Sequence, residues 1–163
     1  MIRKQHKRYE RPRKLYDLVR IKDEDKLVER YGLKNKREIW KTEAKVRYFR
    51  NRAKLLITAS EEEKQKFFSK LNDIGLNVQS IADVLALTKE DLLKRRLSSV
   101  LVSKGIVKTP KEGRQTIVHK RIRINNAVVS SPGYFVRVGE ERAISMKPGQ
   151  LKVKPMEKAE TNE

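Results

Sequence analysis

The sequence predicts an α+β protein: a mainly helical N-terminal domain, followed by a small module of two helices packed on a short antiparallel sheet. Apolar residues recur at three- and four-residue steps along the first half of the chain, which is the helical period. After residue 121, short alternating apolar runs are separated by turn residues, which indicates strands. The formal net charge of +19, from 40 Lys+Arg and 21 Asp+Glu, points to a polyanionic partner.

The charge is concentrated in two blocks separated by a mildly acidic segment. Residues 1–56 carry +12 and residues 92–154 carry +12, whereas residues 57–91 carry −3. We expect two contact surfaces joined by a helical body. The predicted parts are a basic N-terminal extension over residues 1–22, a helical domain over 23–91, a small basic module over 92–150 and a flexible C-terminal tail over 151–163.

The N-terminal extension is basic and lacks clear periodicity, so we expect it to be disordered until it lies along a phosphate backbone. Tyr9 and Tyr16 can stack on bases or pack on the body, and both explanations stay open. A short helix is expected over residues 23–32, capped by Asp23 and closed by Gly32.

A helix of about six turns is expected within residues 33–57. Its apolar stripe consists of Ile39, Trp40, Val46, Phe49, Ala53, Leu56 and Ile57. We assign Trp40 to the core rather than to base stacking. Lys41, Lys45 and Arg52 share another face, and Lys34, Lys36 and Arg37 lie at the start of the helix.

The acidic middle contains two further helices that we expect to pack the body together rather than contact the polyanionic partner. The first begins with a capping box, Ser60-Glu61-Glu62-Glu63, and buries Phe67, Phe68 and Leu71 before Gly75 ends it. The second is expected over Ser80–Leu87.

The first helix of the module begins at the weaker capping box Thr88-Lys89-Glu90-Asp91. Its apolar stripe runs through Leu93, Leu97, Val100 and Leu101, and Gly105 stands where a left-handed capping residue is expected. Lys94, Arg95 and Arg96 fall mostly off the stripe. They are either a solvated helix face or phosphate contacts.

The second helix of the module begins at Pro110, because Thr109 is a good N-cap and Glu112 completes the capping box. Ile117 and Val118 are expected to face inward, leaving Lys111, Arg114, Gln115 and His119 on the surface and Lys120 and Arg121 at the end. Arginine and free helix N–H groups suit phosphate. Cations near a helix C-terminus also favour its dipole, so a structural explanation remains.

Strands are expected on both sides of Asn125-Asn126, which suits a type I′ turn. Ser131-Pro132-Gly133 predicts another turn. Further strands are expected over Tyr134–Val138 and Arg142–Met146.

The module resembles the RNA-binding domain of small-subunit ribosomal protein four. The matching residues are Arg96-Leu97, Gly105, Thr109-Pro110, Arg114-Gln115, Ile124-Asn125, Pro132-Gly133-Tyr134 and Ile144. Gly113 replaces the usual alanine, and Lys120 and Asn126 stand where the family has glycine. Side chains at the last two positions are expected where the backbone favours positive φ. Tyr31 to Glu38, with the basic helix that follows, also resembles the N-terminal domain of that family, in its archaeal and eukaryotic branch.

This resemblance implies a structural constituent of the small ribosomal subunit, located in the cytoplasm on the ribosome. It implies primary binding to a helical junction in the 5′ domain of small-subunit ribosomal RNA, early action in assembly, and an effect on translational accuracy. Neighbouring small-subunit proteins and a place near the mRNA entry path are implied as well. The expected RNA-contacting residues are Lys34, Lys36, Arg37, Lys41, Lys45, Arg52, Lys94, Arg95, Arg96, Lys111, Arg114, Gln115, His119, Lys120, Arg121 and Tyr134.

No enzymatic role and no cofactor are expected. The chain lacks a phosphate loop or dinucleotide fingerprint, and capping explains carboxylates at helix starts. With no cysteine and only two histidines, we expect no metal site. No apolar run long enough to span a membrane occurs, so no membrane partner is expected. The alternatives are a free-standing RNA chaperone or ribosome-associated factor with the same module, and a nonspecific DNA-binding protein.

Overall fold

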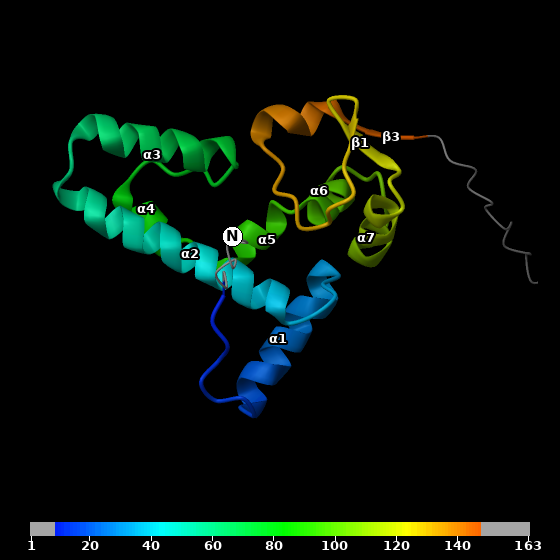
Figure 1. Cartoon of the computed structure of the whole chain (residues 1–163), viewed down its shortest axis with the longest axis horizontal. Coiled ribbons are helices and arrows are strands. Elements are labelled where there is room, and N and C mark those ends of the chain that lie inside the picture. Colours follow the sequence, from blue (N-terminus) through cyan, green and yellow to red (C-terminus); the bar gives the residue numbers. More distant parts are fainter. Residues whose placement is uncertain (1–8, 148–163) are drawn as a thin grey trace, which may run out of the picture.

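The structure, a computed structural model, describes residues 9–147. Residues 1–8 of the predicted N-terminal extension, residues 148–150 of the predicted module and all of the predicted C-terminal tail lie outside the described residues. Its helical elements are α1 Leu18–Tyr31, α2 Arg37–Leu55, η1 Leu56–Thr58, α3 Glu61–Asp73, α4 Ile81–Ala86, α5 Lys89–Lys94, α6 Leu97–Ser103, α7 Pro110–Val118 and η2 Val138–Ala143. Its strands are β1 Ile122–Ile124, β2 Ala127–Val128 and β3 Ile144–Met146. The helical domain followed by a small antiparallel sheet confirms the predicted α+β class (Figure 1).

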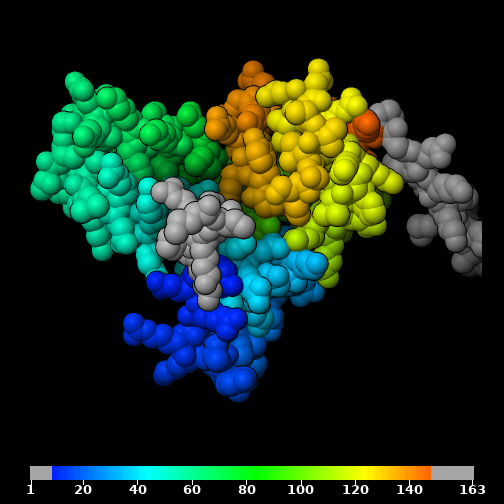
Figure 2. All heavy atoms as spheres, in the orientation of Figure 1, coloured from blue at the N-terminus to red at the C-terminus, as the bar shows by residue number. Residues whose placement is uncertain are grey.

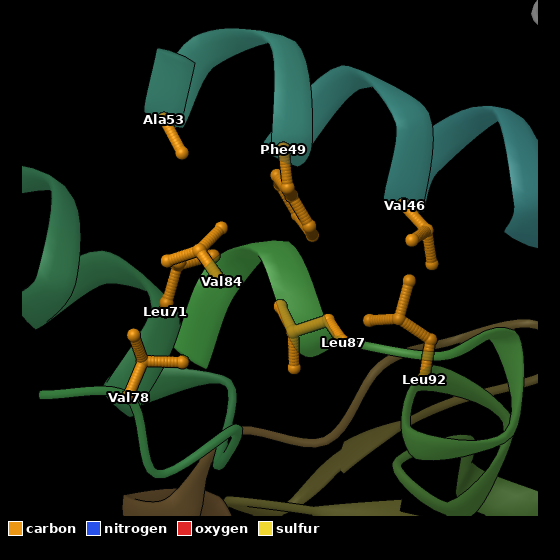
Figure 3. Packing of buried hydrophobic residues seen from close by; sticks show 8 residues of the cluster. All are labelled: Val46, Phe49, Ala53, Leu71, Val78, Val84, Leu87 and Leu92. Carbon is orange, nitrogen blue, oxygen red and sulfur yellow. The ribbon is translucent and has the colours of Figure 1, made fainter. Parts of the chain in front are cut away.

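Helix α2 is the element on which the N-terminal domain is built. It contacts α1, α4 and α5, and it runs diagonally beneath α3 in Figure 1. Val46, Phe49 and Ala53 project from α2 into the core shown in Figure 3, where they meet residues of α3, α4 and α5. The predicted stripe is therefore correct over these positions. At its end the prediction is wrong, because Ile57 lies in η1 and is 55% exposed.

Helix α1 begins six residues earlier than predicted, because its cap is Asp17 and not Asp23. The Asp17 carboxylate accepts from the backbone N–H groups of Val19 and Arg20 at 3.1 and 3.4 Å. Leu18 and Val19 remain 70% and 72% exposed, so no buried stripe marks this turn of the helix. Gly32 ends α1 with φ 59°, as predicted.

The acidic middle forms α3 and α4 as expected. Gly75 follows the end of α3, as predicted, and its φ of 84° is the left-handed conformation typical of a residue at that position. Ser60 precedes α3, but its side chain forms no capping hydrogen bond within the described part of the chain. At α4, Ser80 and Asp83 form a reciprocal capping box, with donor–acceptor distances of 3.2 and 2.9 Å.

The first helix predicted for the module is two helices, α5 and α6, with a break at Arg95-Arg96. Extended backbone at Arg96 pairs with Phe135 in an antiparallel bridge. On either side, Leu97 N–H donates to the Tyr134 carbonyl at 2.9 Å and Val136 N–H donates to the Arg95 carbonyl at 3.1 Å. The strand predicted over Tyr134–Val138 is therefore reduced to this single bridge and does not join the sheet.

The sheet has the order β2-β1-β3, with antiparallel pairing throughout. Asn125 and Asn126 have φ values of 48° and 64°, which confirms the predicted type I′ turn. The turn at residues 131–134 is confirmed by the hydrogen bond from Tyr134 N–H to the Ser131 carbonyl. The last strand is shorter than predicted, because residues 142 and 143 belong to η2.

The module has its own core under this sheet. Leu97 and Leu101 of α6, Ile117 of α7 and Ile122 of β1 are each fully buried. The pairing of α7 with α6 leaves Val118 53% exposed, so its predicted inward orientation is wrong. In Figure 2 the module (yellow to orange) adjoins the lobe formed by α2–α4, and α1 (blue) projects from the junction.

Candidate nucleic-acid interface

The two basic blocks of the sequence meet where α1 ends and α7 begins. An added Cβ at Gly32 would lie 2.7 Å from the Pro110 carbonyl carbon and 2.8 Å from the Lys111 nitrogen. Only glycine fits this approach of the two backbones, because the residue also has positive φ. The contact brings Lys34 and Arg37, both exposed, to the same region as the exposed Lys111.

Glu38 of α2 links the N-terminal domain to two elements of the module, the residue that caps α6 and helix α7. Its carboxylate accepts from the Arg96 guanidinium at 2.6 Å and from two nitrogens of Arg114 at 3.0 and 3.2 Å. Burial raises the pKa of the Glu38 carboxyl, but hydrogen bonds from Arg114 and Arg96 outweigh it, so the pKa lies below its ordinary value. Glu38 therefore stays ionised near neutral pH.

A groove runs beside this ion pair, between α2 and the loop that leads to the Arg96–Phe135 bridge. We call it the domain groove. It is lined by Glu38, Lys41, Thr42, Ala44, Lys45, Tyr48, Arg96, Arg114, Ser131, Pro132, Gly133 and Phe135. Lys41 is exposed, whereas the Lys45 ammonium lies 3.8 Å from the centroid of the Phe135 ring. Burial lowers the pKa of Lys45 below its ordinary value.

Several predicted RNA contacts serve the protein's own structure. Arg95 donates to the Ile74 and Val136 carbonyls at 2.6 and 2.9 Å and pairs with Glu141. The Arg96 side chain is 5% exposed, and its Nε is buried without a partner among the described residues. The two arginines therefore bind the segment between α5 and α6 to other parts of the protein. Because its side chain is buried, Arg96 has little surface left for contact with a phosphate.

Three other predicted contacts also have partners. Lys36 forms an ion pair with Asp25 of α1 at 2.7 Å. Lys94 pairs with Asp91 at 3.4 Å, an exposed pair worth little energy. The Tyr134 hydroxyl donates to the Glu140 carboxylate, and burial, with that hydrogen bond, raises its pKa.

The remaining predicted contacts at the end of α7 lie on a separate part of the surface. His119 and Lys120 are exposed, and Arg121 is half-buried. They are separated from Lys111 by the length of α7, about 13 Å at 1.5 Å per residue. Lys120 has φ 58°, which confirms that a side chain stands at a left-handed position there.

The cations that stay exposed and form no ion pair within residues 9–147 are the best placed to contact RNA. Among the residues predicted from the sequence to contact RNA, the lysines and arginines of this kind are Lys34, Arg37, Lys41, Arg52, Lys111 and Lys120. Gln115 adds an exposed amide on α7. Sequence reasoning missed Tyr48, which lies on the same stripe of α2 as Lys41, Lys45 and Arg52 and is 63% exposed. Tyr48 is three residues after Lys45 and four before Arg52, so the helical period alone could have placed it on this basic face.

Within the described part of the chain, no three histidine or acidic side chains cluster as metal ligands would. The helices of that part include none with the length and apolar character needed to cross a membrane.

Comparison with known proteins places these elements in a family. The S4 domain family model matches residues 95–141, from the break between α5 and α6 into η2. Small ribosomal subunit protein uS4 of Methanothermobacter thermautotrophicus is 37% identical over 99% of this chain and 98% of its own length. The protein of that name from Methanococcus aeolicus is 41% identical, over 90% of this chain and 86% of its own length.

This chain belongs to the uS4 family.

Membership confirms the resemblance drawn from the two sequence blocks. The uS4 relative from Hyperthermus butylicus, 39% identical over 90% of this chain and 86% of its own length, also extends far beyond the S4 domain. The family therefore includes α1 and α2 as well as the module. The exposed cations of α2 lie outside the S4 domain match, whereas Lys111 and Lys120 lie inside it.

Proposed function

We propose that this chain is a structural constituent of the small ribosomal subunit in the cytoplasm, where it binds small-subunit ribosomal RNA and neighbouring small-subunit proteins. The observation that carries the proposal is the domain groove. Lys41 of α2 and Lys111 of α7 are 70 residues apart in the chain, yet the Glu38–Arg114 ion pair joins their helices. The uS4 relatives, named as small-subunit proteins, support this assignment.

Binding follows from electrostatics and shape together. The exposed cations neutralise phosphates and release condensed counterions, which gives affinity that falls with salt. Folded RNA is recognised largely by its shape, so a fixed angle between α2 and the module supplies specificity. The Glu38 ion pairs and the Gly32–Pro110 contact set that angle.

We propose further that the chain is a primary binder of a helical junction in the 5′ domain and acts early in assembly. A place near the mRNA entry path and an effect on translational accuracy belong to the same proposal. The proposal is supported by family membership and by the domain groove, in which ion pairs of Glu38 with Arg96 and Arg114 already fix α2 against the module in the free protein.

A catalytic role is not part of the proposal. Glu38, the acidic residue that lines the domain groove, is bound to two arginines and has a lowered pKa, so it does not supply a proton near neutral pH. The other groups at the groove bind and orient anions rather than activate a nucleophile.

The test is filter binding of the purified chain to folded 5′-domain RNA from an archaeal small subunit, at several salt concentrations and with excess duplex DNA as competitor. We expect tight binding that survives the competitor and weakens moderately with salt. Weak binding that the competitor abolishes would overturn the proposal and leave a general polycation. Equal binding to unrelated folded RNAs would favour the RNA-chaperone alternative.

A further inference from the structure

A second groove opens on the far side of Tyr48, between α2 and α3. It is lined by Tyr48, Phe49, Arg52 and Leu56 of α2 and η1, together with Glu63, Lys66, Phe67, Lys70, Leu71 and Ile74 of α3 and its C-cap. We call it the helical groove. Tyr48 lines both grooves, so the helical groove continues the cationic surface of the domain groove.

The charge on the rim of the helical groove is positive. Arg52, Lys66 and Lys70 are exposed, and none of the three forms an ion pair within residues 9–147. Glu63 is the acidic residue of the lining, which leaves an excess of two positive charges at the rim. Lys66 and Lys70 lie within the segment that the sequence predicts to be acidic and free of RNA contacts. They are four residues apart, so they lie on the same side of α3, toward the groove that they line.

Tyr48 presents an aromatic face between the cations of the two grooves. Its side chain is 63% exposed, while the neighbouring Phe49 is 7% exposed and belongs to the core. Lys41 and Lys45 precede Tyr48 by seven and three residues, and Arg52 follows it by four, so all four side chains lie on the same stripe of α2. An exposed aromatic ring among unpaired cations is the pattern of single-stranded nucleic-acid sites, where bases stack on rings and cations track the backbone. Duplex RNA does not use such a ring, since its base faces are already stacked.

We propose that the helical groove holds an unpaired nucleotide of the small-subunit ribosomal RNA, with its base stacked on Tyr48 and its flanking phosphates bound by Arg52, Lys66 and Lys70. This inference rests on the proposed function and adds the chemical class of the bound element, a looped-out or single-stranded residue. The apolar floor formed by Phe67 and Leu56 accepts the edge of the base.

The test compares variants of the full chain in filter binding to the same folded 5′-domain RNA over a salt series. Tyr48→Leu removes the ring but keeps an apolar side chain, and it is expected to weaken binding about five- to a hundred-fold without changing the salt slope. Tyr48→Phe keeps the ring and is expected to bind within about twofold of the parent chain. Thermal unfolding of each variant checks that the fold is retained.

Cation variants test the phosphate contacts separately. Arg52→Gln, Lys66→Gln and Lys70→Gln are each expected to lower the salt slope by about 0.7, the value for one contact with a single strand. Lys54→Gln is the matched control, because Lys54 lies two residues beyond Arg52 and on the opposite side of α2. It should leave the slope unchanged.

The outcomes separate this inference from the proposed function. Failure of the parent chain to bind the RNA would overturn the proposed function and this inference with it. Tight binding by the parent chain and equal binding by Tyr48→Leu would overturn this inference alone. Equal losses for Tyr48→Leu and Tyr48→Phe would also overturn it, since stacking does not need the hydroxyl group.

Discussion

The Glu38 carboxylate and the Arg114 guanidinium, 76 residues apart in the chain, form a two-point ion pair with N–O distances of 3.0 and 3.2 Å. Arg96 donates to the same carboxylate at 2.6 Å from the break between α5 and α6. One acidic side chain thus connects the N-terminal domain with two separate elements of the module. Removing it is therefore expected to change the stability of the protein, its dependence on pH and the geometry of the domain groove.

Glu38→Ala is expected to lower the free energy of unfolding by about 3 kcal/mol, because the Arg96 guanidinium stays buried without its partner. The control is Glu43→Ala, which removes an exposed carboxylate from the same helix. Urea unfolding followed by circular dichroism measures both. Similar small losses in the two variants would contradict a linking role for Glu38.

Stability is expected to fall as pH drops through the acidic range. The folded-state pKa of Glu38 lies below its ordinary value of 4.5, so between those two values the unfolded chain binds more protons than the folded one. The contribution of Glu38 is therefore complete above pH 4.5 and is lost as pH falls through the folded-state pKa. Urea unfolding from pH 7 to pH 2.5 measures it. Glu38→Gln should reduce the slope in this window, and an unchanged slope would contradict the assignment.

Gly75→Ala is expected to destabilise the protein more than Gly105→Ala. Both residues have positive φ, 84° and 70°, so each substitution costs about 1 kcal/mol in backbone strain. The added Cβ at Gly75 would also lie 2.6 Å from Arg95 Cζ, whereas an added Cβ at Gly105 would have no atom of residues 9–147 within 4 Å. Displacing Arg95 from two carbonyls and Glu141 raises the expected cost to about 3 kcal/mol. Thermal unfolding of the two variants measures the difference in destabilisation. Equal losses would show that Arg95 moves aside without cost.

Lys120→Gly is expected to act on stability and on RNA binding in opposite directions. Glycine relieves the left-handed strain at φ 58° and should stabilise the fold by about 1 kcal/mol. Loss of an exposed cation should weaken binding to 5′-domain RNA and lower its salt slope by about 0.7–0.9. Asn126→Gly is the comparison, with a smaller gain because asparagine tolerates this conformation. Destabilisation by Lys120→Gly would contradict the strain argument.

Lys41→Gln and Lys111→Gln are expected to lower the salt slope of RNA binding by about 0.7–0.9 each, and the double variant by about twice that amount. Lys41 lies on α2 and Lys111 on α7, where the two domains meet. Additive effects would show that one RNA-binding surface includes both helices. Lys26→Gln, which removes a cation that pairs with Asp23 on α1, is the control. Slopes equal to that of the parent chain would remove these two residues from the interface.

Local signals in the sequence predict much of the fold correctly. Thr109 caps α7 through the Glu112 N–H, Gly32 and Gly75 end their helices, and Asn125-Asn126 forms the tight turn. Each of these features depends on hydrogen bonds or backbone preferences within a few residues. They are therefore readable without knowledge of the rest of the chain.

Contacts between distant residues explain what the sequence does not reveal. The break at Arg95-Arg96 interrupts a good helical pattern because Phe135, about 40 residues away, takes the backbone pairing. For the same reason the predicted strand at residues 134–138 has no place in the sheet. Likewise, the sequence shows that residue 96 is an arginine, but it does not show that Glu38, 58 residues earlier, binds it. The RNA-contact assignments themselves stay predictions.

The Glu38 link has a further consequence for how a complex forms. Because α2 and the module are joined by charge-assisted hydrogen bonds in the free chain, little conformational entropy of the protein is lost on association. The protein is a preorganised template, and the adjustment needed for a close fit falls on the RNA.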